Sequence, residues 1–164
     1  MAKITAVAGT KFYIGTQAAL QTTSGTYTNF ATYATYGDTF TLVGTVMDAG
    51  TLGATASDIK VETIGNAIAY HLKGVVDPGT VKLVLANDLS DAGQQALETA
   101  RASTSQTDYN FRYVFPNVGT YYGDIIDVTG KVTGFDTAIT TPNNPVKANV
   151  TLGLNSVRSF TAAK

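Results

Sequence analysis

The stretch YNFRYVFPNVGTYYGDIIDVTGKVTGFDT, from Tyr109 to Thr137, decides the fold class of this chain. In its first part every second residue is aromatic: Tyr109, Phe111, Tyr113 and Phe115. Because successive side chains of a strand point to opposite faces, this period of two predicts a strand with one aromatic face. Such a face could stack bases or sugars, but positive charge is sparse nearby and core packing is the favoured interpretation. Residues 121–129 and 131–139 predict a further hairpin that turns at Gly130.

The segments outside this stretch predict short strands and one helix. Strands are expected at 11–16, at 39–47 and near 146–154, and a type II turn at Asp77–Thr80 is expected to close a hairpin between 67–76 and 81–86. In LSDAGQQALETARA, apolar or small side chains recur at helical spacing: Leu89, Ala92, Ala96, Leu97 and Ala100. Ser90 or Asp91 is the expected N-cap, and the helix should end near Ser103.

These elements together predict one mainly β domain spanning residues 1–164. Seven to nine strands and one helix fit an antiparallel β-sandwich or barrel with the α-helix on its flank. Residues 1–10 and 155–164 are expected to be N-terminal and C-terminal arms. Residues 48–66 are polar and contain glycine, and a loop longer than about 12 residues in a compact domain is usually functional. We expect them to form a projecting hairpin.

The composition points to a surface that packs against other protein. Charged residues make up 14% of the chain, against about 25% in ordinary domains, while Thr, at 27 residues, and Tyr, at 9, are abundant. The net charge of −1 provides no basic field to attract a nucleic-acid backbone. The chain has no Cys, which excludes disulfides and thiolate metal sites. A secretory apolar core and a span of about 20 apolar residues are also missing, so we expect no membrane association.

No catalytic constellation emerges from the sequence. His71 is the only histidine, and without Cys or a carboxylate pair nearby it cannot complete a zinc site of three or four ligands. Asp124 and Asp127 lie three apart in a predicted strand, so they should face opposite ways and not converge on one substrate. No serine lies in a nucleophile elbow, and no glycine run has the spacing of a phosphate-binding loop. We therefore expect no enzymatic activity, no cofactor and no metal.

The order of these parts resembles the major tail tube proteins of long-tailed bacteriophages. The resemblance covers residues 40–155 and is greatest to the lambda-like group, whose tails are flexible and non-contractile. It rests on GQQAL in the helix (Gly93–Leu97), on FPN with a following glycine (Phe115–Asn117 and Gly119), and on the strand–turn–strand segment Gly123–Thr133. The segment ASDIKVET, Ala56–Thr63, is similar to the Asp-containing part of the long inter-ring loop of that family.

This resemblance implies a structural virion protein, assembled in the host bacterial cytoplasm. Its subunits would form hexameric rings that stack into the tail tube, a conduit for genome DNA delivery. The implied partners are further copies of the chain, the tail initiator or tip complex, the length-setting tape measure protein and the tail terminator. Joining sheet edges between subunits would remove the exposed edges that otherwise invite uncontrolled pairing. DNA would pass through the lumen without specific binding.

The resemblance also implies two sets of site residues. The expected inter-ring loop contains Met47, Asp48, Thr51, Ser57, Asp58, Ile59 and Lys60. A lumen that does not retain DNA should be neutral or acidic, and we expect Asp124 or Asp127, one of which must face each way, to place a carboxylate on its wall. Two other interpretations stay open: a tube protein of a contractile tail or type VI secretion system, and a carbohydrate-binding β-sandwich suggested by the nine Tyr and the Thr-rich surface.

Overall fold

The computed structural model describes residues 7–15, 25–27, 39–65, 68–117 and 123–162. The strands are β1 (Lys11–Ile14), β2 (Gly25–Tyr27), β3 (Thr41–Val43), β4 (Val46–Asp48), β5 (Thr55–Val61), β6 (Tyr70–Asp77), β7 (Thr80–Ala86), β8 (Tyr109–Val114), β9 (Ile125–Ala138) and β10 (Lys147–Ala162). One helix, α2 (Ala92–Ala102), lies within the described residues. The predicted class, a mainly antiparallel β fold flanked by a helix, is confirmed.

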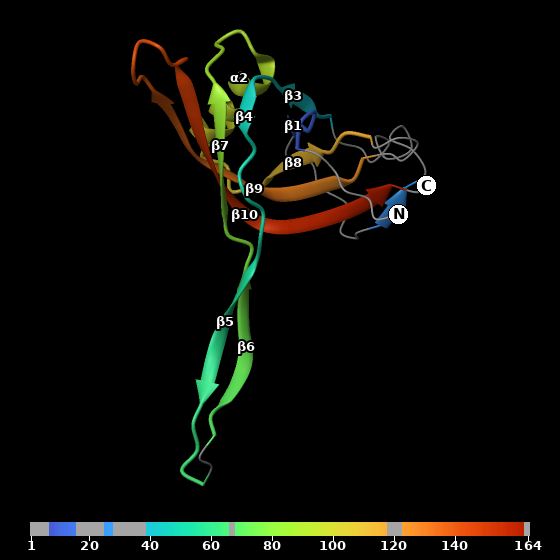
Figure 1. Cartoon of the computed structure of the whole chain (residues 1–164), viewed down its shortest axis with the longest axis vertical. Helices are drawn as coiled ribbons and strands as arrows, with labels where there is room; N and C mark the ends of the chain where they lie inside the picture. Colours follow the sequence, from blue (N-terminus) through green and yellow to red (C-terminus); the bar gives the residue numbers. More distant parts are fainter. Residues whose placement is uncertain (1–6, 16–24, 28–38, 66–67, 118–122, 163–164) are drawn as a thin grey trace.

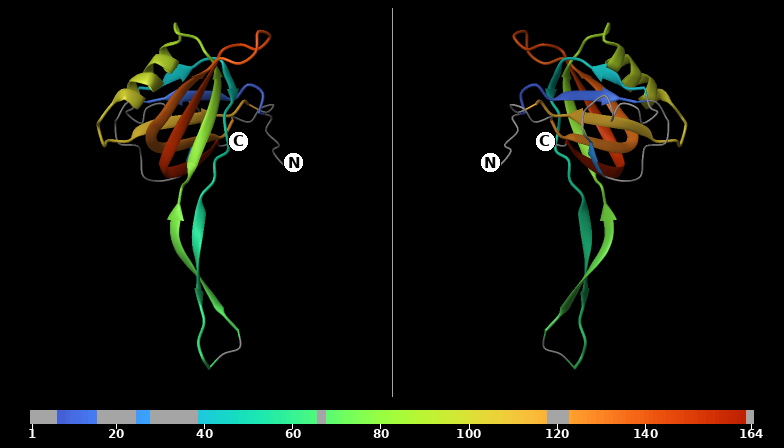
Figure 2. Two further views of the ribbon diagram at one scale, coloured as in Figure 1. Left: turned by 90° about the vertical axis from the view of Figure 1, so that its left-hand side faces the viewer. Right: turned by 90° about the vertical axis from the view of Figure 1, so that its right-hand side faces the viewer.

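The larger sheet curls into an incomplete barrel. Its strand order is β3-β1-β8-β9-β10-β7-β4, and β2 runs parallel to the end of β10. The two strands at the ends of this order, β3 and β4, are separated in the chain by Gly44 and Thr45 alone. The ends of the sheet are therefore drawn together, and the long strands β9 and β10 sweep around the body (Figures 1 and 2).

The core lies inside this curved sheet, on the side that α2 covers. Alternating residues of the central strands are buried there: Val81, Leu83 and Leu85 of β7, Phe111 and Tyr113 of β8, and Val150, Leu152 and Leu154 of β10. The ring of Phe12 stacks on Phe111, with centroids 6.0 Å apart, and lies 4.9 Å from Tyr113. The aromatic face predicted for β8 is thus core. Leu97 and Ala100 of α2 complete the cluster.

Helix α2 begins and ends where the sequence predicts. The carboxylate of Asp91 caps its first turn by accepting a hydrogen bond from the Gln94 amide at 2.8 Å, and Ser103 is the C-cap. Two side chains lie elsewhere than expected. Leu89, assigned to the apolar stripe, precedes the helix and is 79% exposed. Gln94, which does not belong to the predicted apolar stripe, is buried.

The first turn of α2 closes a break in the sheet. Residues 39–47, predicted as one strand, contain β3 and most of β4, which are separated by Gly44 and Thr45. The φ of Thr45, 57°, is left-handed. The Gly44 amide donates to the Asp91 carboxylate at 3.1 Å, and Gln94 Nε2 donates to Thr45 Oγ1 at 2.8 Å. These bonds replace the sheet hydrogen bonds that the gap interrupts, so a continuous strand is not needed.

The hairpin predicted to turn at Gly130 does not form. Strand β9 runs without interruption from Ile125 to Ala138 and pairs with β10 along almost its whole length. At Gly130 a Cβ would overlap the carbonyl oxygen of Gly153 on β10. Glycine is therefore needed at position 130 because the two strands approach each other closely, and not because the chain turns there.

The predicted C-terminal arm is also wrong. Strand β10 extends from Lys147 to Ala162 and stays paired with β9 as far as Phe160, so residues 155–162 belong to the sheet. Residues 163–164 lie outside the described part, as do residues 1–6 of the expected N-terminal arm. Residues 155–162 lack a strong apolar alternation, and it is the long partner β9 that holds them in place.

The turn at Asp77–Thr80 has the predicted local geometry and a different role. Gly79 has a φ of 81°, and its amide donates to Asp77 Oδ1 at 2.8 Å. However, β6 and β7 do not pair with each other, because β6 pairs with β5 while β7 pairs with β4 and β10. The chain passes through this point from the projecting β5–β6 ribbon into the body (Figure 1).

Candidate functional site

The most distinctive surface of the subunit is a two-stranded ribbon that extends far from the body, on the side away from α2 (Figures 1 and 2). Strands β5 and β6 form a sheet of their own, paired from Thr55 with Asp77 to Val61 with Tyr70. We call residues 55–77 the arm. The hairpin expected within 48–66 therefore supplies only the first strand, and its partner lies beyond that range.

The arm is amphipathic, because its register places apolar residues opposite apolar residues and charged or polar residues opposite each other across the two strands. One face carries the apolar pairs Ile59 with Leu72 and Val61 with Tyr70. The other face carries the charged or polar pairs Asp58 with Lys73 and Lys60 with His71. Ile59, Leu72 and Tyr70 are 50%, 54% and 55% exposed, so the apolar face is open to solvent in the subunit. Beyond it, Ile64 and Ile68 are exposed near the tip.

Two close contacts between polar side chains lie on the charged face of the arm. His71 Nδ1 lies 2.6 Å from Asp58 Oδ2, and Lys60 Nζ lies 2.5 Å from Glu62 Oε1. All four side chains are more than half exposed, so these pairs contribute little free energy. His71 is thus a cross-strand surface residue. Among the described residues no group of three or more His, Cys, Asp or Glu is arranged to hold a metal ion.

The arm has the physical character of a protein-binding element. An isolated two-stranded ribbon is marginally stable in water, and exposed apolar residues gathered on one face are typical of interaction sites. A partner that covers Ile59, Tyr70 and Leu72 would remove apolar area from water and hold the two strands together. The arrangement can therefore bind a complementary protein surface.

The residues predicted for the inter-ring loop divide between the arm and its base. Met47 and Asp48 lie in β4, Thr51 lies in the connection, and Ser57, Asp58, Ile59 and Lys60 lie in β5. Tyr70 and Leu72 on the second strand were not among the predicted residues. The alternation of apolar and charged residues in YHLK, Tyr70–Lys73, was the available signal, but those residues were assigned to a hairpin with β7.

The two carboxylates proposed for a channel wall lie in different environments. Asp127 is fully buried on the sheet face opposite the core, where Arg112 donates from Nε to Oδ1 at 2.8 Å and from Nη2 to Oδ2 at 3.0 Å. The ring of Phe40 covers this pair, 3.8 Å from the guanidinium carbon. Asp127 therefore presents no charge at the subunit surface. Asp124 lies immediately before β9 and is partly exposed.

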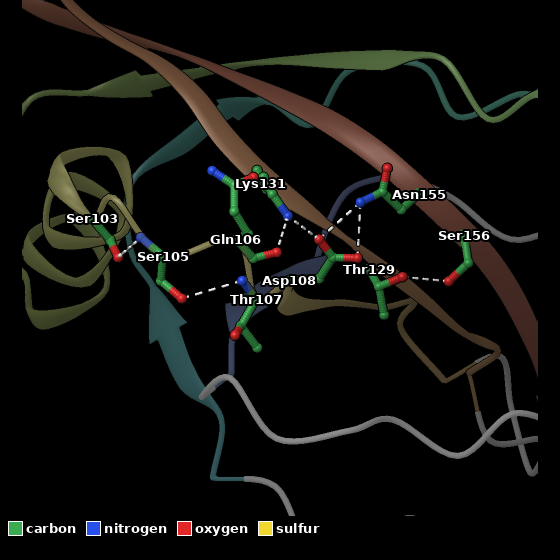
Figure 3. Close-up of polar contacts among 9 residues, drawn as sticks. All are labelled: Ser103, Ser105, Gln106, Thr107, Asp108, Thr129, Lys131, Asn155 and Ser156. Atoms are coloured by element: carbon green, nitrogen blue, oxygen red, sulfur yellow. Dashed lines mark hydrogen bonds and ion pairs between the residues drawn. The ribbon is translucent and has the colours of Figure 1, made fainter.

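A second polar cluster fastens the α2–β8 loop to the sheet (Figure 3). Lys131 Nζ donates to Gln106 O at 2.6 Å and to Asp108 Oδ1 at 2.5 Å, while Asn155 Nδ2 donates to both Asp108 oxygens at 2.8 Å. Although partial burial alone would raise the Asp108 pKa, the bonds from Lys131 and Asn155 and the Lys131 charge hold that pKa below its ordinary value. Thr129 and Ser156 share a hydroxyl hydrogen bond beside this cluster.

Comparison with solved structures shows which fold this is. A chain of the anti-feeding prophage (AFP) baseplate, solved by cryo-EM with six-fold symmetry, superimposes with a TM-score of 0.68 over 98% of both chains at 8% identity. The SPP1 tail tube, solved by solid-state NMR and cryo-EM, gives a TM-score of 0.58 over 94% of this chain and 78% of that one, at 13% identity. The chain has the tail tube fold.

At these low sequence identities, the two matches establish only the fold. No protein-family model matches the sequence, and no curated protein does. Within the described ranges, none of the helical structure is long and apolar enough to cross a membrane.

Proposed function

We propose that this protein is the ring-forming subunit of a tail tube, in a phage or a phage-tail-like particle. The observation that carries the proposal is the arm: a subunit with the tail tube fold extends an amphipathic ribbon whose apolar face is uncovered. A ribbon of this kind suits a contact between successive rings. The six-fold symmetry of the AFP baseplate supports rings of six subunits.

In this proposal the protein is structural, is found in the tail of the particle, and is assembled in the host bacterial cytoplasm. Its partners are further copies of itself, the tail initiator or tip complex, the tape measure protein and the tail terminator. Genome DNA would pass through the lumen without specific binding. Asp124 is the candidate for a carboxylate on the channel wall, since Asp127 is buried against Arg112.

The kind of tail is a separate part of the proposal. The sequence resemblance favours a non-contractile tail of the lambda-like group, and the match to the SPP1 tail tube supports tube formation. The AFP chain has the higher TM-score of the two and covers this chain more completely, which favours a contractile-type particle as the second candidate. A sheath protein that binds around the purified tubes would select the second candidate.

Electron microscopy of the purified protein, together with its mass in solution, tests the proposal. We expect rings or hollow tubes of uniform width at high protein concentration. Ile59→Thr should prevent assembly, because it removes apolar area from the arm and keeps a residue suited to a strand. Lys60→Thr is the matched control, since the neighbouring side chain lies on the charged face, and it should assemble normally.

Two outcomes would contradict the proposal. A wild-type protein that stays monomeric at high concentration and binds a defined glycan on an array would be a carbohydrate-binding sandwich instead. Equal assembly of Ile59→Thr and Lys60→Thr would show that the apolar face of the arm is not the contact.

A further inference from the structure

The end of the subunit opposite the arm carries its own exposed apolar residues. The loop from Asn87 to Asp91 and the connection from Ile139 to Val146 lie side by side there (Figures 1 and 2), joined by a hydrogen bond from the Asn87 amide to the Val146 carbonyl at 2.9 Å. Leu89 and Ile139 are 79% and 81% exposed. Large apolar side chains gathered at an exposed end are typical of an interaction surface.

A groove opens beside Leu89, between the start of α2 and the end of β9. Its volume is about 180 Å³, and its walls include Asn87, Leu89, Gln94, Glu98, Phe135 and Thr137. We call this surface the apical groove. It is partly apolar, through Leu89 and Phe135, and its rim carries the carboxylate of Glu98.

The loop that presents Leu89 is held rigidly by hydrogen bonds. Asp88 accepts from the Ser90 amide at 2.9 Å, the Asp88 amide donates to Gln94 Oε1 at 3.1 Å, and Gln95 Nε2 donates to the Leu89 carbonyl at 2.7 Å. Because these bonds already order the backbone that carries Leu89, a partner that covers Leu89 loses little further conformational entropy by ordering the loop. The groove is thus preorganised for binding.

We propose that the apical groove receives the apolar face of the arm from a second copy of this chain. A head-to-tail contact requires two different, complementary surfaces on each subunit, and these two lie at opposite ends of the molecule. Repeating that contact adds one subunit after another along an axis. The inference rests on the proposed function and adds to it the surface that the arm occupies.

Charge supports the same pairing. Lys73 on the arm and Glu98 at the groove rim are both exposed, and neither has an ion-pair partner among the residues that the structure describes. A lysine side chain is long enough to reach past the ribbon edge while its aliphatic part covers apolar surface. Lys73 belongs to the charged face of the arm, so its side chain would meet Glu98 by bending around the ribbon edge when the apolar face docks.

Cysteine cross-linking tests the contact directly, because the natural chain contains no Cys and every disulfide must come from the introduced residues. The full chain carrying Leu72→Cys and Leu89→Cys is assembled, oxidised and run on a non-reducing gel. Each chain would have one donor and one acceptor position, so we expect a ladder of cross-linked multimers. The control pairs Leu72→Cys with Thr104→Cys, an exposed position just past the opposite end of α2, and should give no ladder.

The outcomes separate this inference from the proposed function. Normal tubes whose Leu72→Cys residues link only to each other, or to Thr104→Cys, would overturn the apical groove and leave the tube subunit intact. Subunits that never form rings or tubes would overturn both. As a second variant, Leu89→Glu should raise the protein concentration needed for assembly by about tenfold or more, because one buried leucine is lost at each contact. An unchanged assembly concentration would count against the groove.

Discussion

Arg112 on β8 and Asp127 on β9 form a bidentate ion pair, and both side chains are almost completely buried. The pair lies on the sheet face opposite the apolar core, so the central strands are buried on both faces. Removing one partner leaves an uncompensated charge in the interior, whereas removing both does not.

Asp127→Ala should therefore destabilise the subunit by about 3–5 kcal/mol, the usual cost of breaking a buried pair. Urea denaturation followed by circular dichroism measures the free energy of unfolding. The double variant Arg112→Met with Asp127→Leu should recover most of that loss. A destabilisation below about 1 kcal/mol for the single variant, typical of surface pairs, would contradict this account.

Gly130→Ala should destabilise the sheet, because the new Cβ would overlap a backbone oxygen of Gly153 that cannot rotate away. We expect a loss of about 1–3 kcal/mol, as in other overpacked sites. Gly134→Ala is the matched control on the same strand, since its Cβ would lie 3.4 Å from the Thr151 side chain. Thermal melting of the two variants side by side provides the measurement, and equal melting temperatures would contradict the close approach.

Asp91→Ala should cost more than loss of an ordinary helix cap. The Asp91 carboxylate accepts from the Gln94 amide and also from the Gly44 amide at the break between β3 and β4. Loss of an N-cap alone costs about 1 kcal/mol, and up to about 2. We expect a larger loss of unfolding free energy, measured in urea. Ser90→Ala, next to the cap, should change it by less than about 0.5 kcal/mol, and similar effects of both variants would rule out the double role.

Asp108 should make the fold sensitive to acid. Its pKa in the folded protein is lowered chiefly by hydrogen bonds from Lys131 and Asn155 and by the Lys131 charge, against the opposing effect of partial burial. The ionised carboxylate therefore stabilises the fold above its unfolded pKa of about 3.9, and this contribution is lost as the pH falls through the lower folded pKa.

Asp108→Asn should consequently be destabilised at pH 7 and should lose less stability than the wild type between pH 7 and pH 3. Melting temperatures at both pH values provide the test. Lys131→Met removes the charged partner and should reduce the pH dependence in the same direction. A wild-type pH dependence in both variants would show that the cluster does not couple stability to ionisation.

Local patterns predicted the local elements well. The spacing in residues 89–102 and the capping chemistry of Asp91 located α2, and the alternation from Tyr109 to Phe115 identified a core strand. Both signals arise from neighbours in the chain, because burial of one face imposes the period of that element. The mainly β class with a flanking helix follows from the same signals.

Errors arose where distant segments decide the structure. Gly130 is a residue type common in turns, but its surroundings are set by β10, the antiparallel neighbour that lies close against it. Gly79 has the backbone angle of the predicted turn, but the partner of β6 proved to be β5, not β7. A local turn signal specifies dihedral angles and carries no information about which strand lies alongside.

By itself, the sequence determined the class of the fold, the position of α2 and the aromatic core strand, and it narrowed the N-cap of α2 to Ser90 or Asp91, since each depends on side chains a few residues apart. Only the tertiary structure decided that Arg112 and Asp127 meet, that the arm pairs β5 with β6, and that Leu89 stands exposed at the opposite end. Those features depend on strand register and sheet curvature, which are set by packing between segments far apart in the chain.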